Sequence, residues 1–594
     1  MRPQLALAAG LLASALASRA AAQDVQVLPA RGPAPTLDDL PPLPALTALS
    51  PRNTMLYADR VRVGQGAAPQ GMVPASSPLV DAVLPTSVTG TSKPEGIQYA
   101  LPQSPAGPVP LLVAWHGFGS SAATVSDQTT LDEECDARGW AYLAVTGIDD
   151  KLFGPPLAQQ NVAAAIAWMH TQIELDDSRL YMVGFSAGGG CVANFAARHR
   201  DPDGPVVAAL GTVSASMDWT QTWWLEPATR TWLQNPFNFG GPPSFSLFAY
   251  QRSSTLYFDP DTYPPAPGTA LDSFAMAQNL HATPAWITWD TGDTIGYLPK
   301  QSVHLAALLG SYGDTVQAVP VSGTTDPDTG LPATHSWAVL DETALCDFLA
   351  AHVAQPLPGA VTALVDDERD VAWMHVEPRD PQAFAWVRGE ADPSGTAVAV
   401  HDVKGADRVL VAPAAPGPWD ISAGAADAAG FQTGVFDAAP AAGYALNKQG
   451  HVVPGFEYEP AGAGLLLAVT KSVSFHVQPR TWDATLAVAP DPALTGSPVA
   501  VKIDAAMGAK MAWLVAGVGL DELPFGSGHL LLVEPVPPFV LMPVPLDASG
   551  NVKLQSTIPG NGKLSGAWVF LQAIVQGPGA VISGASNPFR FDVQ

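Results

Sequence analysis

The central part of the chain alternates short apolar runs with segments of helical periodicity. Apolar runs bounded by turn residues predict strands at 97–101, 110–115, 141–145, 180–183 and 285–289. Apolar residues recur at helical spacing at 131–139, 161–173 and 341–352. Strands that alternate with helices predict a mostly parallel sheet flanked by helices, and therefore an α/β fold.

Two other regions depart from this pattern. Between about residues 217 and 283 the alternation stops, and aromatic residues become frequent amid Pro and Gly. Beyond residue 357 helical periodicity nearly vanishes, and short alternating or β-branched runs stand between turns. Strands at this spacing predict two small all-β, sandwich-like domains, at 358–480 and 481–594.

The N-terminal segment has the pattern of an export signal. Arg2 precedes an apolar run at 5–17, and the small residues Ala20-Ala21-Ala22 end it. This pattern predicts a signal peptide at 1–22 and a secreted or periplasmic protein. Residues 23–94, rich in Pro, Ala and Ser, predict a leader that is partly ordered at best.

Composition narrows the class of protein. The 594 residues include only 14% charged residues, with a formal net charge of −26, so neither nucleic acid nor an anionic membrane is an expected partner. Three cysteines cannot form a disulfide framework. A Cys135–Cys346 pair is possible, whereas Cys191 is expected as a small buried apolar residue.

Candidate chemistry begins with a Gly-Phe-Ser-Ala-Gly segment at 184–188, where an apolar strand runs into a predicted helix. In a G-x-S-x-G motif the glycines allow a sharp strand-to-helix turn that exposes the serine. The motif predicts Ser186 as a nucleophile, with the Ala187 N–H directed at a developing oxyanion.

A serine nucleophile needs a base, and the base needs an acid that orients it. Asp293 follows the strand at 285–289 and is the expected acid, with Asp290 as the competitor closer to the strand. His335, in the loop before the last helix, is the expected base. Three other histidines fit the order or the context less well: His281, His304 and His352.

The strand at 110–115 is followed by the glycine-containing loop His116-Gly117-Phe118-Gly119. Its glycines allow the backbone to approach a substrate, so the Phe118 N–H is the expected second oxyanion donor. His116 precedes the nucleophile in the chain and is expected to brace the loop.

These motifs resemble the polyhydroxybutyrate depolymerase and feruloyl-esterase group of α/β-hydrolases. The resemblance rests on His116–Gly119, 135–140 (Cys-Asp-Ala-Arg-Gly-Trp), 184–189, Gly292-Asp293 and His335-Ser336-Trp337, and it covers roughly 96–354. It implies an α/β-hydrolase domain at 95–357, a triad of Ser186, Asp293 and His335, and ester hydrolysis through an acyl-enzyme without metal or organic cofactor. Two features differ from the family: Trp289-Asp290 stands where many members have His-Gly, and the aromatic insert has no counterpart.

Several alternatives stay open at this point. The aromatic insert is expected to form either a lid with its own core or a substrate-binding wall, with Trp219 and Trp337 as candidate substrate contacts. Asp326 to Gly330 resembles a calcium loop but lacks further acidic ligands, so we interpret it as a turn and expect no metal site. The expected function is hydrolysis of a carboxylic ester, such as a polyester.

Feruloyl or acetyl-xylan esterase and secreted serine peptidase are alternative activities that use the same triad. A surface-binding protein with a vestigial hydrolase domain is the alternative of a different class.

Overall fold

The computed structural model describes most of the first two thirds of the chain and separate strands beyond it. The described residues are 78–257 except 152, 276–411 except 328, 356, 394 and 395, and then 419–435, 443–446, 456–459, 464–469, 473–479, 484–489, 498–505, 509–517, 520–525, 529–533, 540–557, 568–577, 582–586 and 589–592. The predicted signal peptide and residues 23–77 of the predicted leader lie outside them. No helix within these ranges has the length and apolar character needed to cross a membrane.

Contacts divide the chain into two units. The described residues up to 372, together with 376–388, form the first unit, and residues 373–375 with those from 389 onward form the second. The boundary expected at 357 therefore falls inside the first unit.

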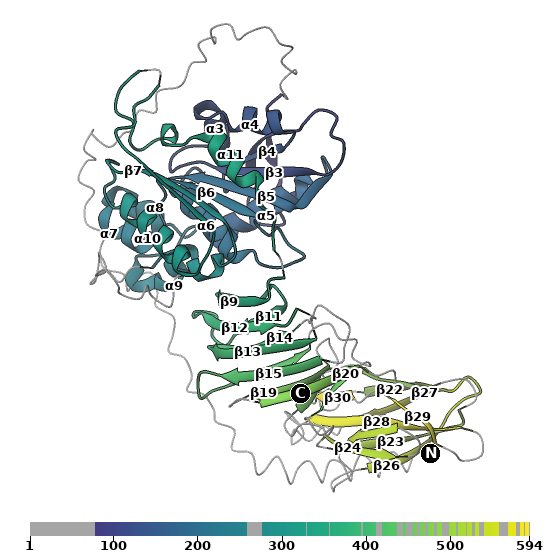
Figure 1. Ribbon diagram of the computed structural model, residues 1–594. Helices are drawn as coiled ribbons and strands as arrows, with labels where there is room; N and C mark the ends of the chain where they lie inside the picture. Colours follow the sequence, from purple (N-terminus) through teal and green to yellow (C-terminus); the bar gives the residue numbers. More distant parts are fainter. Residues whose placement is uncertain are drawn as a thin grey trace. The chain divides into compact units, whose positions relative to one another are not determined.

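The first unit is built on an eight-stranded sheet in the order β1-β2-β4-β3-β5-β6-β7-β8 (Figure 1). The strands are β1 (Val80–Leu84), β2 (Glu95–Ala100), β3 (Val109–Trp115), β4 (Ala141–Val145), β5 (Leu175–Phe185), β6 (Ala209–Val213), β7 (Ala285–Asp290) and β8 (Val316–Val321). β2 is antiparallel to both of its neighbours, and all pairs from β4 to β8 are parallel. With helices on both faces, this arrangement is the α/β-hydrolase fold.

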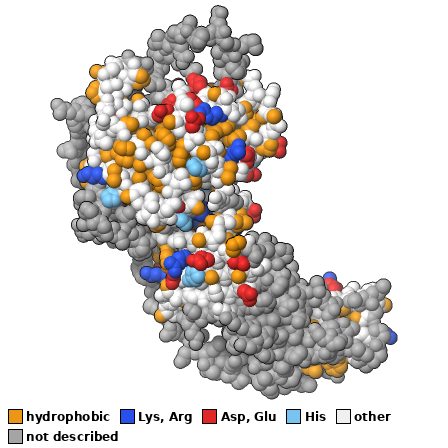
Figure 2. All heavy atoms as spheres, viewed as in Figure 1, with side chains coloured by type: hydrophobic (Ala, Val, Ile, Leu, Met, Phe, Trp, Pro, Cys, Tyr) orange, Lys and Arg blue, Asp and Glu red, His pale blue; other side chains and the backbone are white. Residues whose placement is uncertain are grey.

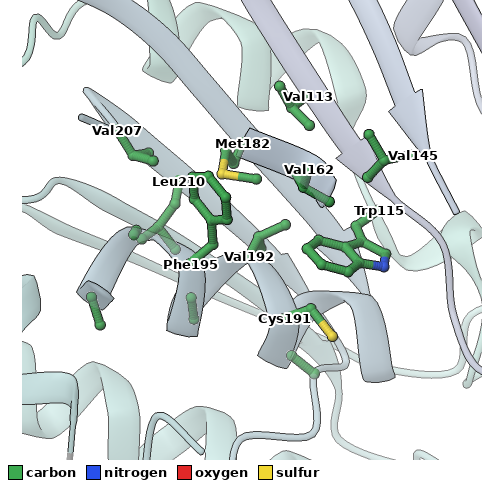
Figure 3. Packing of buried hydrophobic residues seen from close by; sticks show 14 of the residues in the cluster. Val113, Trp115, Val145, Val162, Met182, Cys191, Val192, Phe195, Val207 and Leu210 are labelled. Atoms are coloured by element: carbon green, nitrogen blue, oxygen red, sulfur yellow. The ribbon is translucent and has the colours of Figure 1, made fainter. Parts of the chain in front are cut away.

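Apolar residues alternate between the two faces of the central strands, which are buried on both sides. In β3, Val113 and Trp115 belong to one core, whereas Leu112 and Ala114 belong to the other. The first core is packed against α5 (Pro156–Met169) and α6 (Ala187–Arg198). Figure 3 shows Cys191 and Val192 of α6 close to Trp115. The second core is packed against α3 (Ala122–Gln128), α4 (Leu131–Arg138) and α11 (Glu342–Ala350).

The aromatic insert is helical where the structure describes it. Its helices are α7 (Trp219–Leu225), η3 (Pro227–Thr229), α8 (Arg230–Leu233), α9 (Pro243–Ser253) and η4 (Met276–Leu280). Asp218 starts α7 because its carboxylate accepts the N–H groups of Thr220 (2.8 Å) and Gln221 (3.2 Å). The remaining helices of the unit are α2 (Thr86–Thr89), α10 (Leu298–Ser311) and η5 (Trp337–Val339).

Charged side chains are few on the face of this unit that Figure 2 shows. On the face shown in Figure 2, scattered charged side chains stand among apolar and uncharged polar ones. The low charged fraction of the sequence is thus visible in the folded unit.

Beyond α11, the residues that the structure describes form strands, as the sequence predicts. In chain order they are β9 (Ala360–Val365), β10 (Arg369–Val371), β11 (Met374–Pro378), β12 (Ala385–Ala391), β13 (Ala397–Lys404), β14 (Ala406–Val411), β15 (Trp419–Ala425), β16 (Phe431–Val435), β17 (Gly443–Leu446), β18 (Phe456–Glu459), β19 (Gly464–Val469), β20 (Val473–Pro479), β21 (Ala484–Ala489), β22 (Pro498–Ala505), β23 (Met511–Gly517), β24 (Leu520–Phe525), β25 (His529–Val533), β26 (Val540–Pro545), β27 (Asn551–Thr557), β28 (Trp568–Gln576), β29 (Ile582–Ala585) and β30 (Phe589–Asp592). Within the second unit, one sheet contains the run β17-β20-β15-β13 and another the run β14-β16-β19-β18. Further on, β22 lies between β21 and β27, and β23 between β26 and β28.

Two expectations, on the leader and on the cysteines, can be compared with the structure. The end of the predicted leader is ordered, because β1 pairs with β2 and α2 follows it. The three cysteines are buried free thiols, so the possible Cys135–Cys346 disulfide is not formed, whereas Cys191 is buried in the core as expected.

Candidate active site

Ser186 lies at the sharp turn between β5 and α6, at the carboxyl end of the parallel strands. Its backbone has φ 53° and ψ −118°, a conformation that non-glycine residues rarely adopt. A Cβ at Gly184 would collide with the Gly188 carbonyl oxygen, and a Cβ at Gly188 would collide with the carbonyl oxygens of Trp115 and His116. The two glycines are therefore needed for the close packing that holds the serine in this strained position.

The structure brings the three predicted triad residues together. His335 Nε2 lies 3.0 Å from Ser186 Oγ, and His335 Nδ1 lies 2.9 Å from Asp293 Oδ2. The His335 and Asp293 side chains are 3% and 0% exposed, so water does not compete for their contact. The other Asp293 oxygen accepts the N–H of Ile295 at 2.7 Å, which fixes the carboxylate's orientation.

The competing acid has a different role. Asp290 is buried and accepts the Thr324 N–H (2.8 Å) and hydroxyl (2.5 Å) at one oxygen and the Gly292 N–H (2.7 Å) at the other. Burial alone would raise the pKa of Asp290, but these hydrogen bonds outweigh it and lower the pKa. Asp290 thus organises the loop that carries Asp293.

The competing histidines also have other partners. His281 Nδ1 lies 2.9 Å from Asp314. The ring nitrogens of His116 face the carbonyl oxygens of Gly117 (2.6 Å) and Thr146 (3.0 Å), which confirms its predicted role as a brace of the loop after β3.

Both predicted oxyanion donors lie at the cavity next to Ser186. Ala187 is the first residue of α6, and the first N–H groups of a helix have no acceptor within the helix. Phe118 lies in the loop after β3, where the following residue, Gly119, donates its N–H to the Asp150 carbonyl at 2.7 Å. The loop between β4 and α5 therefore supports the loop that carries Phe118.

A buried carboxylate supports this second loop in turn. Glu95 Oε1 accepts the N–H groups of Thr146 (3.0 Å) and Gly147 (2.6 Å), and Oε2 accepts that of Ile148 (2.8 Å). Burial raises the pKa of Glu95 to about 7, although these hydrogen bonds oppose the shift. Sequence reasoning missed Glu95, since a lone Glu at the start of a strand carries no motif.

The cavity in front of Ser186 has a volume of about 300 Å³ and is amphipathic. Its lining includes Ser186, His335 and the two predicted oxyanion donors, Phe118 and Ala187. The apolar part is lined by Phe118, Phe153, Trp219, Ile295 and Leu298, and the polar part by Ser216, Thr222, Glu226, Thr229 and Tyr297. A second cavity of about 410 Å³ has no triad residue in its lining.

The two predicted substrate contacts are placed differently. Trp219 lines the cavity, packs against Phe153 with ring centroids 5.0 Å apart, and donates its indole N–H to the Ser253 carbonyl at 2.7 Å. Trp337 is 2% exposed, packs against Phe185 and does not line the cavity, which corrects the expectation for this residue. The chain enters η5 at Trp337, and this turn directs the indole into the core.

The lining of the cavity also bears on whether the aromatic insert forms a lid or a wall of the binding site. Trp219, Thr222, Glu226 and Thr229 all come from the insert and line the cavity. The described part of the insert therefore forms a wall of the cavity as well as packing on itself. Glu226 was not among the predicted site residues. Its charge is the signal that could have identified it, since Asp218 and Glu226 are the only acidic residues within 217–258.

The lining offers few donors for a metal ion. Among the described lining residues, the carboxylate of Glu226 and the imidazole of His335 are the strong ligand groups. Protein zinc sites use three or four such ligands, so this pair does not form one.

No family model and no curated protein matches the chain. Solved structures do match it. An esterase from the archaeon Pyrobaculum calidifontis is 18% identical, with 46% of this chain and 83% of that chain covered and a TM-score of 0.32. A thermostable carboxylesterase from a metagenomic library is 16% identical, with 47% and 90% covered and a TM-score of 0.32. An acylaminoacyl peptidase from Pyrococcus horikoshii is 12% identical, with 42% and 38% covered and a TM-score of 0.32.

Proposed function

We propose that this protein is a serine hydrolase that cleaves carboxylic esters. The observation that carries the proposal is the continuous hydrogen-bonded line from Asp293 through His335 to Ser186, with Ser186 on a strained turn at the cavity. Such a line is the arrangement that activates a serine hydroxyl.

The proposed reaction has two halves. His335 Nε2 takes the proton of Ser186 Oγ as that oxygen attacks the ester carbonyl carbon, and the Phe118 and Ala187 N–H groups bind the resulting oxyanion. The bond to the alcohol oxygen then breaks, and the alcohol leaves with the proton from His335. Water, deprotonated by His335, attacks the acyl-enzyme, and the acid leaves as Ser186 regains its proton.

Asp293 acts through His335 throughout. Its carboxylate accepts the Nδ1–H, which fixes the tautomer that leaves Nε2 free to accept the serine proton. It also stabilises the imidazolium that forms in each half of the reaction.

The direct test compares the wild-type protein with Ser186→Ala on p-nitrophenyl butyrate. The account expects turnover by the wild type and a loss of at least about 10⁴-fold in kcat in the variant. Far-UV circular dichroism is the control for folding, since serine and alanine have similar volumes. Equal turnover by a folded Ser186→Ala variant would overturn the proposal.

For the substrate, we propose an apolar, polymeric ester such as a polyester. This finer proposal is supported by a group of large exposed apolar side chains in the insert, whose Glu226 and Thr229 line the cavity. The group comprises Trp224, Leu225, Trp232, Phe237, Phe245 and Leu247. Exposed apolar groups of this kind mark binding surfaces for apolar partners.

This proposal is tested by separating the surface from the chemistry. Replacing Trp224 and Phe245 by Ser should lower the rate on a suspended polyester film more than the rate on p-nitrophenyl butyrate. The ratio of the first rate to the second should therefore fall. Feruloyl and acetyl-xylan esters and a peptide p-nitroanilide complete the panel. Faster cleavage of one of these three than of any polyester would contradict the polyester proposal.

We also propose export of the protein to the periplasm or the medium, supported by the N-terminal pattern described above. Expression with and without residues 1–22, followed by fractionation and N-terminal sequencing, tests it. The expected mature protein begins at Gln23.

A further inference from the structure

Glu226 is an ionisable group in the substrate cavity that the proposed mechanism does not use. It follows α7, and its backbone is held on both sides. Its N–H donates to the Thr222 carbonyl (2.8 Å), and its own carbonyl accepts the Thr229 N–H (3.0 Å) and hydroxyl (2.9 Å). The side chain, half-buried, therefore starts from a fixed point in the cavity wall.

The charge of Glu226 is not balanced within the cavity. Among the described residues, the Glu226 carboxylate forms no ion pair, and no Lys or Arg belongs to the lining. Burial raises the pKa of Glu226, while the proximity of His335 lowers it. The second of these effects indicates that the Glu226 carboxyl group lies within electrostatic range of the His335 imidazole, and both residues line the cavity.

The other polar groups of the lining are neutral. Tyr297 donates its hydroxyl to Thr222 Oγ1 (3.4 Å), and burial raises the pKa of the phenol, so it stays protonated. Asp293 lies behind His335, with its charge directed at the imidazole. A substrate that enters the cavity therefore meets the Glu226 carboxylate, with no Lys or Arg beside it in the described lining.

Resting on the proposed ester hydrolysis, we propose that Glu226 is a specificity residue that selects against esters carrying a carboxylate near the scissile bond. The same repulsion acts on carboxylate products and weakens their binding after deacylation. An uncharged ester, in contrast, meets the hydroxyl groups and aromatic rings of the lining without this repulsion.

The size of the effect follows from Coulomb's law. Two like charges about 7 Å apart in a partly solvated cavity disfavour binding by roughly 5- to 10-fold. This selectivity should weaken as salt is added, because the cavity is open to solvent.

Two pairs of esters of matched size measure the selectivity on both sides of the scissile bond. On the alcohol side, 4-acetoxybenzoate is compared with neutral 4-acetoxybenzamide. On the acyl side, mono-p-nitrophenyl adipate is compared with p-nitrophenyl heptanoate. The quantity of interest is the ratio of kcat/KM for the anionic ester to that for the neutral ester.

Substituting Glu226→Gln should raise this ratio about 5- to 10-fold in at least one pair. Glu226→Asp keeps the charge and should shift the ratio much less. Glu133→Gln is the matched control, since Glu133 is an exposed carboxylate on α4 outside the cavity lining, and it should leave the ratio as in the wild type.

The wild-type protein gives a second measurement that needs no variant. Its anionic-to-neutral ratio should rise between 20 mM and 500 mM salt in the pair that Glu226 affects. Ratios that are the same in Glu226→Gln and the wild type for both pairs, or that are insensitive to salt, would overturn the inference. A protein that cleaves none of the four esters would instead overturn the proposed function, and this inference with it.

Discussion

Helix α6 has a buried polar cluster at each of its ends, and the two clusters differ in what surrounds them. At the N-terminal end, Ser186 meets His335 and Asp293 and opens onto the cavity. At the C-terminal end, Arg198 lies 2.9 Å from Asp366, whose side chain is 0% exposed.

In the C-terminal cluster, three arginines contact one buried carboxylate. Besides Arg198, the Asp366 carboxylate contacts Arg252 (2.6 Å) and Arg369 (2.8 Å). Burial alone would raise the pKa of Asp366, but the three arginines outweigh it and lower the pKa. All its oxygen atoms are engaged by cations, so this cluster fixes α6, α9 and the β9–β10 connection to one another.

The N-terminal cluster contains a line of hydrogen bonds that ends at the Ser186 hydroxyl, the proposed nucleophile. We infer that a buried polar group has a structural role when opposite charges enclose it, and that it is available for chemistry when one side faces a cavity.

The largest effect is expected at the reactive end. Asp293→Asn should keep the fold but lower kcat by about 10⁴-fold, because the amide favours the wrong tautomer of His335. Steady-state kinetics on p-nitrophenyl butyrate measures it. Asp290→Asn is the control, since Asp290 holds its loop and should change kcat far less; a larger loss in Asp290→Asn would reverse the assignment of the acid.

Substitution in the C-terminal cluster should lower the stability of the protein. Asp366→Ala leaves three arginines without their central partner and should lower the free energy of unfolding by about 3–5 kcal/mol. Chemical denaturation monitored by tryptophan fluorescence measures it. A loss below about 1 kcal/mol, the size typical of an exposed ion pair, would show that the cluster is not the structural clamp described above.

Another buried carboxylate, Glu95, has no cationic partner among the described residues and should therefore show the opposite pH dependence to Asp366. Its pKa is raised to about 7, so the folded protein holds its proton more tightly than the unfolded chain does. Its contribution to stability is fully present below pH 4.5 and is lost as the pH rises to 7, by about 3 kcal/mol.

The difference in unfolding free energy between the wild type and Glu95→Gln, measured from pH 4.5 to 8, isolates this contribution. The wild type should lose stability relative to the variant as the pH rises. A difference that does not change with pH would contradict the role of burial. Asp366, with a lowered pKa, should instead lose its contribution as the pH falls below about 4.

The smallest effect is expected at the rim of the arginine cluster. Asp367 contacts the same arginines, but its side chain is 46% exposed. Asp367→Ala should therefore cost about 1 kcal/mol or less in unfolding free energy, because solvent screens the pairs. The same denaturation experiment compares it with Asp366→Ala, and equal losses would remove the distinction between enclosed and exposed carboxylates.

The reactive end could be predicted from sequence because its chemistry is local. Gly184, Ser186 and Gly188 form one contiguous motif, and the acid and base follow strands and loops in a fixed order. The enclosed end carries no such signal, since Arg198, Arg252 and Asp366 come together only through tertiary packing. Contact of this kind is decided by which helix faces meet, and the pattern along the chain does not specify it.

Prediction of the fold from the sequence has the same limit. Central strands such as β4 were predicted to the residue, because buried strands are continuous apolar runs. β1 was missed because its residues are mostly exposed and lie in a Pro- and Ser-rich context. Trp337 is a candidate substrate contact by sequence, but in the turn into η5 its indole is buried against Phe185 and does not line the cavity.

The central claim is that Ser186, and no other serine, is the activated nucleophile. Labelling with a fluorophosphonate followed by peptide mass spectrometry tests it most directly. We expect one phosphonylated residue, Ser186, with labelling lost in His335→Ala and ester hydrolysis falling in step with the labelled fraction. Hydrolysis that persists after complete labelling of Ser186, or a label found on a different serine, would contradict it.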